Sequence, residues 1–173
     1  MRSGRKPVFS ADNVTRLVSW AALECQKQQS GEASVWWMLE GWSYAYRHYD
    51  EPVTTEFVQR VGGLVEPRKN THGEWRDVDV RVGFTVMPKW DKVPRLMDAL
   101  VEAWGELDSD TWYREFEEVH PFADGNGRTG NILWNLHRGR LNPWQVRFPP
   151  DFWGAGRLRI PDNRKLISRE DAG

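Results

Sequence analysis

The glycine-rich stretch VHPFADGNGRTGN, residues 119–131, is flanked on both sides by apolar residues at helical spacing, and this constrains the fold more than any other feature. The flanking apolar residues are Trp112, Phe116, Val119, Ile132 and Leu136. Gly125, Gly127 and Gly130 spell G-x-G-x-x-G, but that pattern binds dinucleotides only after a strand, within a βαβ unit. A helix is expected before it here, so the sequence excludes a Rossmann-type domain.

Helical apolar spacing also dominates the rest of the chain. It predicts helices at residues 11–29, 31–50, 54–63, 94–107, 108–120 and 131–141. Asp12 or Asn13 is the expected N-cap of the first helix. Ser109 or Asp110 is the expected N-cap of the fifth, and the third is expected to end at the glycine pair 62–63.

Residues 73–88 differ, because their apolar side chains alternate with other residues as in a strand. The alternating positions are Val78, Val80, Val82, Phe84 and Val86. Gly83 predicts a bend or hairpin turn among them. Residues 142–156 are rich in proline and aromatic side chains and are expected to pack as a strap. The predicted fold is a mainly α domain with one short β-hairpin.

The composition excludes several classes of protein. The chain has 24 Lys and Arg residues against 25 Asp and Glu, and its net charge of −1 argues against a dedicated nucleic-acid binder. A single cysteine, Cys25, is typical of a reducing cytoplasm, and neither a secretory signal nor a membrane span is expected. We expect a cytoplasmic protein with tails at 1–10 and 156–173 around one domain at 11–155.

The glycine-rich loop combines three kinds of chemistry. Glycines at a helix N-terminus let backbone N–H groups approach phosphate oxygens, and Asn126 and Arg128 add side-chain donors there. Asp124 is a hard oxygen ligand of the kind that Mg²⁺ accepts beside phosphates. His120 titrates near neutrality and can take a proton from a hydroxyl. The loop therefore indicates transfer of a phosphate-containing group, and no further ligands follow at a spacing suited to zinc.

The segment HPFADGNGR, residues 120–128, resembles the signature of the Fic family, H-P-F-x-(D/E)-G-N-G-R-x-x-R. The likeness extends upstream, where GEWRDVDVRVGF and VPRLMDAL are similar to the family's hairpin flap and next helix, and it covers about residues 70–145. The resemblance implies a compact Fic-type helical domain with a short β-hairpin flap over the active-site loop.

The activity that the resemblance implies is transfer of AMP from ATP to a Ser, Thr or Tyr hydroxyl of a target protein. His120 is then the general base, Asp124 holds Mg²⁺ on the α- and β-phosphates, and Arg128 neutralises charge on the β-phosphate. The anion cradle is expected to consist of Gly125, Asn126 and Gly127. Phe122 is the expected buried anchor of the loop.

A protein partner is implied as well. The flap is expected to pair with an extended segment of the target through its backbone, and the residues assigned to this contact are Val80, Val82, Gly83, Phe84 and Val86. The segment WMLEG resembles the family's inhibitory pattern (S/T)-x-x-x-E-(G/N), with Trp36 in the place of Ser or Thr. Glu40 is therefore a candidate inhibitory residue or a solvated one, and an antitoxin or other inhibitory partner is a related expectation.

Position 131 departs from the family signature, because Asn131 stands where the last arginine is expected. That arginine normally helps to hold the γ-phosphate, and an asparagine carries no charge. Binding then relies less on the γ-phosphate, or a different nucleotide is used. Two other functions stay open at this stage: a Doc-like kinase that moves the γ-phosphate, and a catalytically silent module that binds a nucleotide or a peptide.

Overall fold

The computed structural model describes residues 9–152, and within that range the chain is mainly helical, as predicted. The helices are α1 (Ala11–Lys27), α2 (Ala33–Arg47), α3 (Thr55–Val65), α4 (Val93–Glu102), α5 (Ser109–Val119) and α6 (Asn126–His137). The short elements are the 3-10 turns η1 (Thr71–Gly73), η2 (Trp90–Lys92) and η3 (Ala103–Gly105), and the strands β1 (Arg81–Val82) and β2 (Thr85–Val86). Residues 1–8 of the predicted N-terminal tail and the whole predicted C-terminal tail lie outside the described residues.

Both predicted helix caps are wrong by a few residues. Ser10 caps α1, because its hydroxyl accepts the N–H of Asn13 at 3.2 Å. Asp108 caps α5, because its carboxylate accepts the N–H groups of Asp110 and Thr111, each at 3.0 Å. In both cases the residues expected to cap lie inside the helix.

Among the other boundaries that differ, two lie at glycines of the chain. Helix α3 continues past the glycine pair 62–63, and the ring of Phe122 lies directly against Gly62. A Cβ atom at Gly62 would fall 2.1 Å from Phe122 Cζ, so any side chain there would displace the ring. Helix α6 begins at Asn126, ahead of the predicted segment 131–141, so the second half of the glycine-rich loop is helical.

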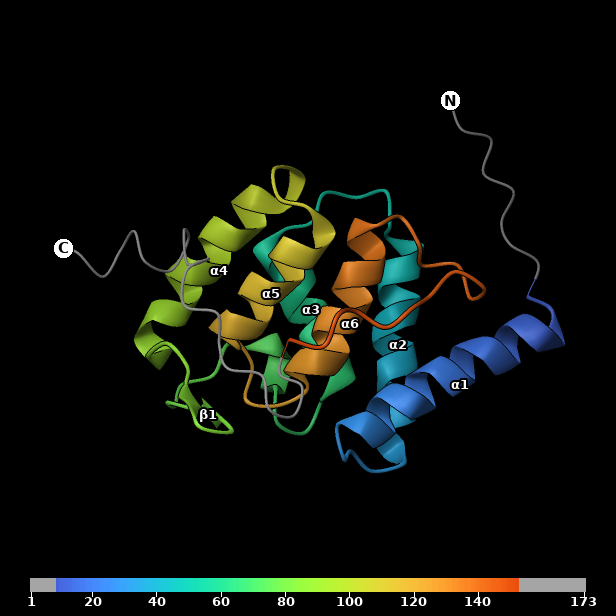
Figure 1. Ribbon diagram of the computed structural model, residues 1–173, viewed down its shortest axis with the longest axis horizontal. Helices are drawn as coiled ribbons and strands as arrows, with labels where there is room; N and C mark the ends of the chain where they lie inside the picture. The colour runs from blue at the N-terminus through green and yellow to red at the C-terminus, as the bar shows by residue number, and fades with distance from the viewer. Residues whose placement is uncertain (1–8, 153–173) are drawn as a thin grey trace.

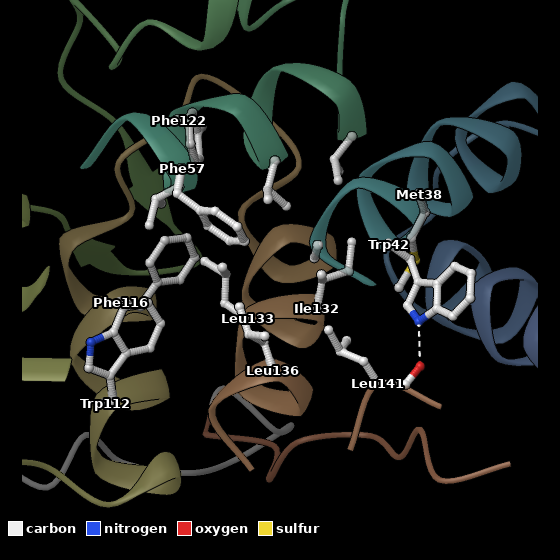
Figure 2. Close-up of a cluster of buried hydrophobic side chains, with 14 of the residues drawn as sticks. Met38, Trp42, Phe57, Trp112, Phe116, Phe122, Ile132, Leu133, Leu136 and Leu141 are labelled. Carbon is white, nitrogen blue, oxygen red and sulfur yellow. Dashed lines mark hydrogen bonds between the residues drawn. The ribbon is translucent and has the colours of Figure 1, made fainter. Parts of the chain in front are cut away.

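Helix α6 lies at the centre of the fold, between α5 and α2 (Figure 1), and it also contacts α3. Its apolar side chains point into the core from both sides of the helix (Figure 2). Phe116 and Trp112 of α5 lie on one side, and Trp42 of α2 lies on the other. A helix that is buried nearly all around its first three turns is held in a fixed position, and it is the helix that carries the motif residues.

The segment after α6 packs as the expected strap over the residues that the structure describes. The Trp42 indole donates to the carbonyl of Leu141 at 2.9 Å (Figure 2), and the Trp20 indole donates to the carbonyl of Arg147 at 3.2 Å. Asn135 exchanges two hydrogen bonds of 2.9 Å with the backbone of Arg147. The strap therefore ties α1, α2 and α6 together. In the part of the chain from 9 to 152, no helix has the length and apolar character needed to cross a bilayer.

Candidate active site

The loop between α5 and α6 begins with a residue in a strained backbone conformation. His120 ends α5 with left-handed angles, φ 50° and ψ 60°, and its N–H donates to the carbonyl of Phe116 at 3.0 Å. Such angles are uncommon for residues other than glycine. They turn the chain sharply, so that Phe122 enters the core two residues later. Its ring centroid lies 5.1 Å from that of Trp75, and the prediction of a buried anchor is confirmed.

Asn126 closes this turn from the inside. Its Oδ1 accepts the N–H of Phe122 at 2.8 Å, and its Nδ2 donates to the carbonyl of the same residue at 2.9 Å. The side chain of Asn126 is therefore used to shape the loop. Any contribution that it makes to an anion cradle comes from its backbone N–H, which lies at the N-terminus of α6 where helical N–H groups have no intrahelical acceptor.

Asp124 is the one carboxylate of residues 120–128 and is partly exposed, and Lys69 and Asn70, in the turn that follows α3, hold it in place. Asn70 donates to its carbonyl at 2.8 Å and accepts its N–H at 3.3 Å, while Lys69 forms an ion pair with Oδ2. The N–H of Gly125 donates to Oδ1 at 2.6 Å. Burial alone raises the pKa of Asp124, but the hydrogen bonds from Lys69 and Gly125 outweigh it and hold the pKa below the usual value. Asp124 is therefore ionised at neutral pH.

Arg128 is buried beneath the loop. Its guanidinium donates to the carbonyl of Val65 at 3.1 Å and to the Glu66 carboxylate at 3.2 Å, and it lies 3.7 Å from Asp124 Oδ1. Its Nε is buried without a hydrogen-bond partner. The group expected to neutralise a phosphate thus joins α6 to the end of α3.

The expectation that His120 titrates near neutrality is wrong, because His120 is a neutral imidazole throughout the physiological pH range. Burial disfavours the imidazolium and, with the charge of Arg76, lowers the pKa of His120 to about 4, against smaller opposing effects of the Glu117 carbonyl and of Asp124. Its Nδ1 is buried and has no hydrogen-bond partner. A neutral imidazole near an ionised carboxylate is in the protonation state that can accept a proton.

Arg76 connects the flap to the turn at His120 and Pro121. Its guanidinium donates to the carbonyls of His120, Val78 and Pro88, at 2.8, 2.8 and 2.5 Å. Its backbone N–H donates to the carbonyl of Pro121 at 2.9 Å. The buried side chain of Arg76 therefore fixes the start of the hairpin relative to His120, the candidate general base.

The flap is a short hairpin, and the alternation over residues 78–86 does not form one continuous strand. Strand pairing joins Arg81 to Val86 and Val82 to Thr85, around a turn in which Gly83 has a φ of 57°. Of the assigned target-contact residues, Val80 and Val82 are half-buried, whereas Gly83, Phe84 and Val86 are exposed. The expected hairpin turn is confirmed, and its tip is apolar.

Position 131 contacts a glutamate that the sequence analysis did not single out. Asn131 is fully buried, and its Nδ2 donates to Glu24 of α1 at 3.0 Å. Gln28 donates to the other oxygen of Glu24 at 2.5 Å, and its amide lies over Gly127, where an added Cβ atom would fall 1.8 Å from Nε2. Glu40, the candidate inhibitory residue, lies on the exposed side of α2. The end of α1, and not Glu40, therefore contacts the motif.

The structure brings His120, Asp124, Arg128 and the first turn of α6 together around one loop, with the flap beside them. This arrangement defines a class of protein, a helical domain that presents a histidine and a carboxylate at the glycine-rich N-terminus of a buried helix. Residues 52–137 match the family model described as the Fic/DOC family, and the chain belongs to that family.

Solved structures agree with this assignment. A Fic domain-containing signalling protein from Bacteroides thetaiotaomicron VPI-5482 superposes with a TM-score of 0.53 at 20% identity, covering 61% of this chain and 48% of that one. A Fic family protein from Desulfovibrio desulfuricans G20 gives 0.57 at 20% identity, covering 78% and 50%. IbpAFic2 in complex with adenylylated Cdc42 gives 0.61 at 11% identity, covering 87% and 53%.

At these identities the likeness establishes the fold, which is the expected Fic-type helical domain. The chain spans about half the length of the structures that it resembles. No curated protein matches it in sequence.

Proposed function

We propose that this chain is a protein nucleotidyltransferase that moves AMP from ATP to a Ser, Thr or Tyr hydroxyl of a target protein. The observation that carries the proposal is the neutral imidazole of His120, which ends α5 four residues before the ionised Asp124 and six before the first residue of α6. Base, carboxylate and anion-binding helix end are the three groups that transfer of a nucleotide requires.

In the proposed reaction, the hydroxyl oxygen of the target bonds to the α-phosphorus of ATP, and its proton passes to the neutral imidazole of His120. The bond from the α-phosphorus to the β-phosphate oxygen breaks, and pyrophosphate leaves. The backbone N–H groups of Gly125, Asn126 and Gly127 stabilise negative charge on the phosphates. Arg128 neutralises charge on the β-phosphate from beneath the loop, where its guanidinium stays paired with Glu66.

Asp124 is the residue that holds Mg²⁺ in this proposal. Among residues 9–152 no group of three or more His, Cys, Asp or Glu side chains gathers as a metal site. A single half-exposed carboxylate nevertheless fits Mg²⁺, because this ion usually binds one or two carboxylates together with substrate phosphates and water. When bound, the ion would neutralise developing charge on the phosphates.

The flap gives the proposal its partner, since the exposed apolar tip of a hairpin can pair with an extended segment of another protein. IbpAFic2, whose fold the chain shares, forms a complex with adenylylated Cdc42. We place the reaction in the cytoplasm, and an inhibitory partner protein belongs to the same proposal.

The test uses ATP labelled at either the α- or the γ-phosphate, with Mg²⁺ and with or without cell lysate. The variant His120→Asn is suited to it, because asparagine tolerates left-handed backbone angles. Label on protein from α-ATP alone, reduced by about 10²-fold or more in the variant, is the expected result. Label from γ-ATP alone would identify a kinase instead, and no label from ATP, UTP, GTP or CTP would identify a binding module.

A further inference from the structure

Three cationic side chains contact the loop that carries the motif, and only one of them is free to move. Within residues 9–152, Arg76 is 3% exposed and Arg128 is 1% exposed, and both are bonded to carbonyl groups of the fold. The side chain of Lys69 is 58% exposed and is bound to Asp124. A phosphate arriving at the loop can therefore recruit Lys69 without disturbing the core.

The two buried arginines, Arg76 and Arg128, supply little positive charge to a phosphate bound at the loop. The charge of Arg128 is opposed by Glu66, a carboxylate buried in the same pair at 3.2 Å. Releasing Arg128 would leave the buried Glu66 with only Arg68, whose Nε lies 3.7 Å from Oε1, and loss of the closer partner of a buried carboxylate is unfavourable. Asn131 is uncharged, and its amide is bonded to Glu24. Arg128 is therefore already paired with a buried carboxylate, and position 131 adds no positive charge to the cradle.

Lys69 is well placed to correct this balance. It precedes Asn70, whose side chain makes two hydrogen bonds to the backbone of Asp124, so the base of the lysine is fixed relative to the loop. Its flexible stem and three donors allow the ammonium to exchange one anion for another. An ion pair between two partly exposed groups is weak, so such an exchange is not costly.

We propose that Lys69 is a phosphate-binding residue of the nucleotide site, supplying from the end of α3 the charge that position 131 lacks. In the free protein Lys69 neutralises Asp124, and when a nucleotide binds, its ammonium contacts the phosphates. The proposal rests on the proposed function only to the extent that the site binds a nucleotide.

The alternative is that Lys69 only holds Asp124 in position, and a double-mutant cycle separates the two roles. The cycle comprises the wild type, Lys69→Ala, Asp124→Asn and the double variant. Affinity for ADP is measured calorimetrically in the presence of EDTA, so that no metal contributes. Arg140→Ala is the matched control, because it removes one exposed positive charge beyond the opposite end of α6.

A phosphate contact predicts that Lys69→Ala weakens ADP binding about tenfold or more in both the wild-type and the Asp124→Asn backgrounds. Lys69→Arg should retain most of the affinity, and Arg140→Ala should change it little. A loss of ADP affinity only in the background that keeps Asp124 would overturn the proposal. A lysine that only holds Asp124 in position has no effect once Asp124 is replaced by asparagine.

The outcome is independent of group transfer. ADP binding that depends on Lys69 in a protein that transfers no label would support this inference and reject the proposed function. Transfer of AMP together with an ADP affinity that Lys69→Ala leaves unchanged would support the proposed function and reject this inference. A wild type and an Asp124→Asn variant that both fail to bind ADP in EDTA would overturn this inference alone, because the proposed function uses Mg²⁺ and is tested by the labelling experiment.

Discussion

The loop of residues 120–128 and the flap of residues 78–86 are linked through Arg76 but are built in opposite ways. In the loop, Phe122 and Arg128 are buried, and the side chain of Asn126 bonds back to the loop itself. In the flap, Phe84 is fully exposed, and each strand is only two residues long. The loop thus has its geometry fixed before any ligand binds, whereas the flap keeps apolar surface available for a partner.

Arg76 is the point at which the rigid and the exposed regions meet. Its guanidinium binds the carbonyl of His120 on one side and those of Val78 and Pro88 on the other. A segment of a target bound along the flap would therefore be held at a fixed position relative to His120. The side chain of Arg76 thus links the buried loop to the exposed flap.

The largest expected effect is on the rigid side of this comparison. Phe122→Ala should lower the free energy of unfolding by about 3–5 kcal/mol, because it empties a buried site between Trp75 and Gly62. Urea denaturation measures the change. The control Phe122→Leu keeps most of the volume and should cost clearly less. A loss below about 1 kcal/mol for alanine would show that the core does not anchor the loop.

The second effect concerns pH and His120. As pH falls, an unfolded histidine takes up its proton near pH 6.5, whereas folded His120 resists protonation until about pH 4. The unfolded state therefore binds more protons in this window, and stability is lost as pH falls through it. By pH 5 the loss should be on the order of 2 kcal/mol. Urea denaturation at pH 7.5 and pH 5 measures it.

His120→Gln is the control for this measurement, because it removes the titrating group. The difference between the two proteins isolates His120, since Glu115, whose pKa burial raises to about 7, titrates in both. Equal pH dependence in the wild type and the variant would contradict the lowered pKa. The same comparison would then weaken the case for a neutral base at the site.

The sequence identified the loop residues because they are consecutive, but not the residues that hold them. His120 and Asp124 were readable from one short segment. Their partners come from far along the chain: Arg76 lies 44 positions from His120 and Asn70 lies 54 from Asp124. Glu24, the partner of Asn131, lies 107 positions away. Nothing in local periodicity indicates such contacts, since they are created by packing.

The helices illustrate the same limit. Apolar spacing located each helix, because the apolar side chains of each pack into the core at helical spacing. It misjudged α3, where Gly62 lies inside the helix to admit the ring of Phe122. A glycine pair predicts a helix end only when backbone freedom is its role. At Gly62 the absence of a side chain matters instead, and only the packed structure shows this.

A third, smaller effect concerns access to the rigid loop. The amide of Gln28 lies over Gly127, where we expect a phosphate, and it is held there by Glu24. Gln28→Ala should therefore tighten ATP binding severalfold, by less than about 1.4 kcal/mol. Calorimetry measures the affinity, and Leu23→Ala, an exposed change on the same helix, is the control. Unchanged or weaker binding would show that Gln28 does not obstruct the cradle.

The smallest effect on stability is expected in the exposed flap. Phe84→Ala should change the free energy of unfolding by less than about 0.5 kcal/mol, because the side chain has no packing to lose. Affinity for ATP should also stay unchanged, while labelling of the target protein falls. Trp144→Ala, at an exposed position of the strap, should leave all three quantities unaltered. A large loss of stability at Phe84 would mean that the flap packs against part of the fold, and the division between a rigid loop and an available flap would then be wrong.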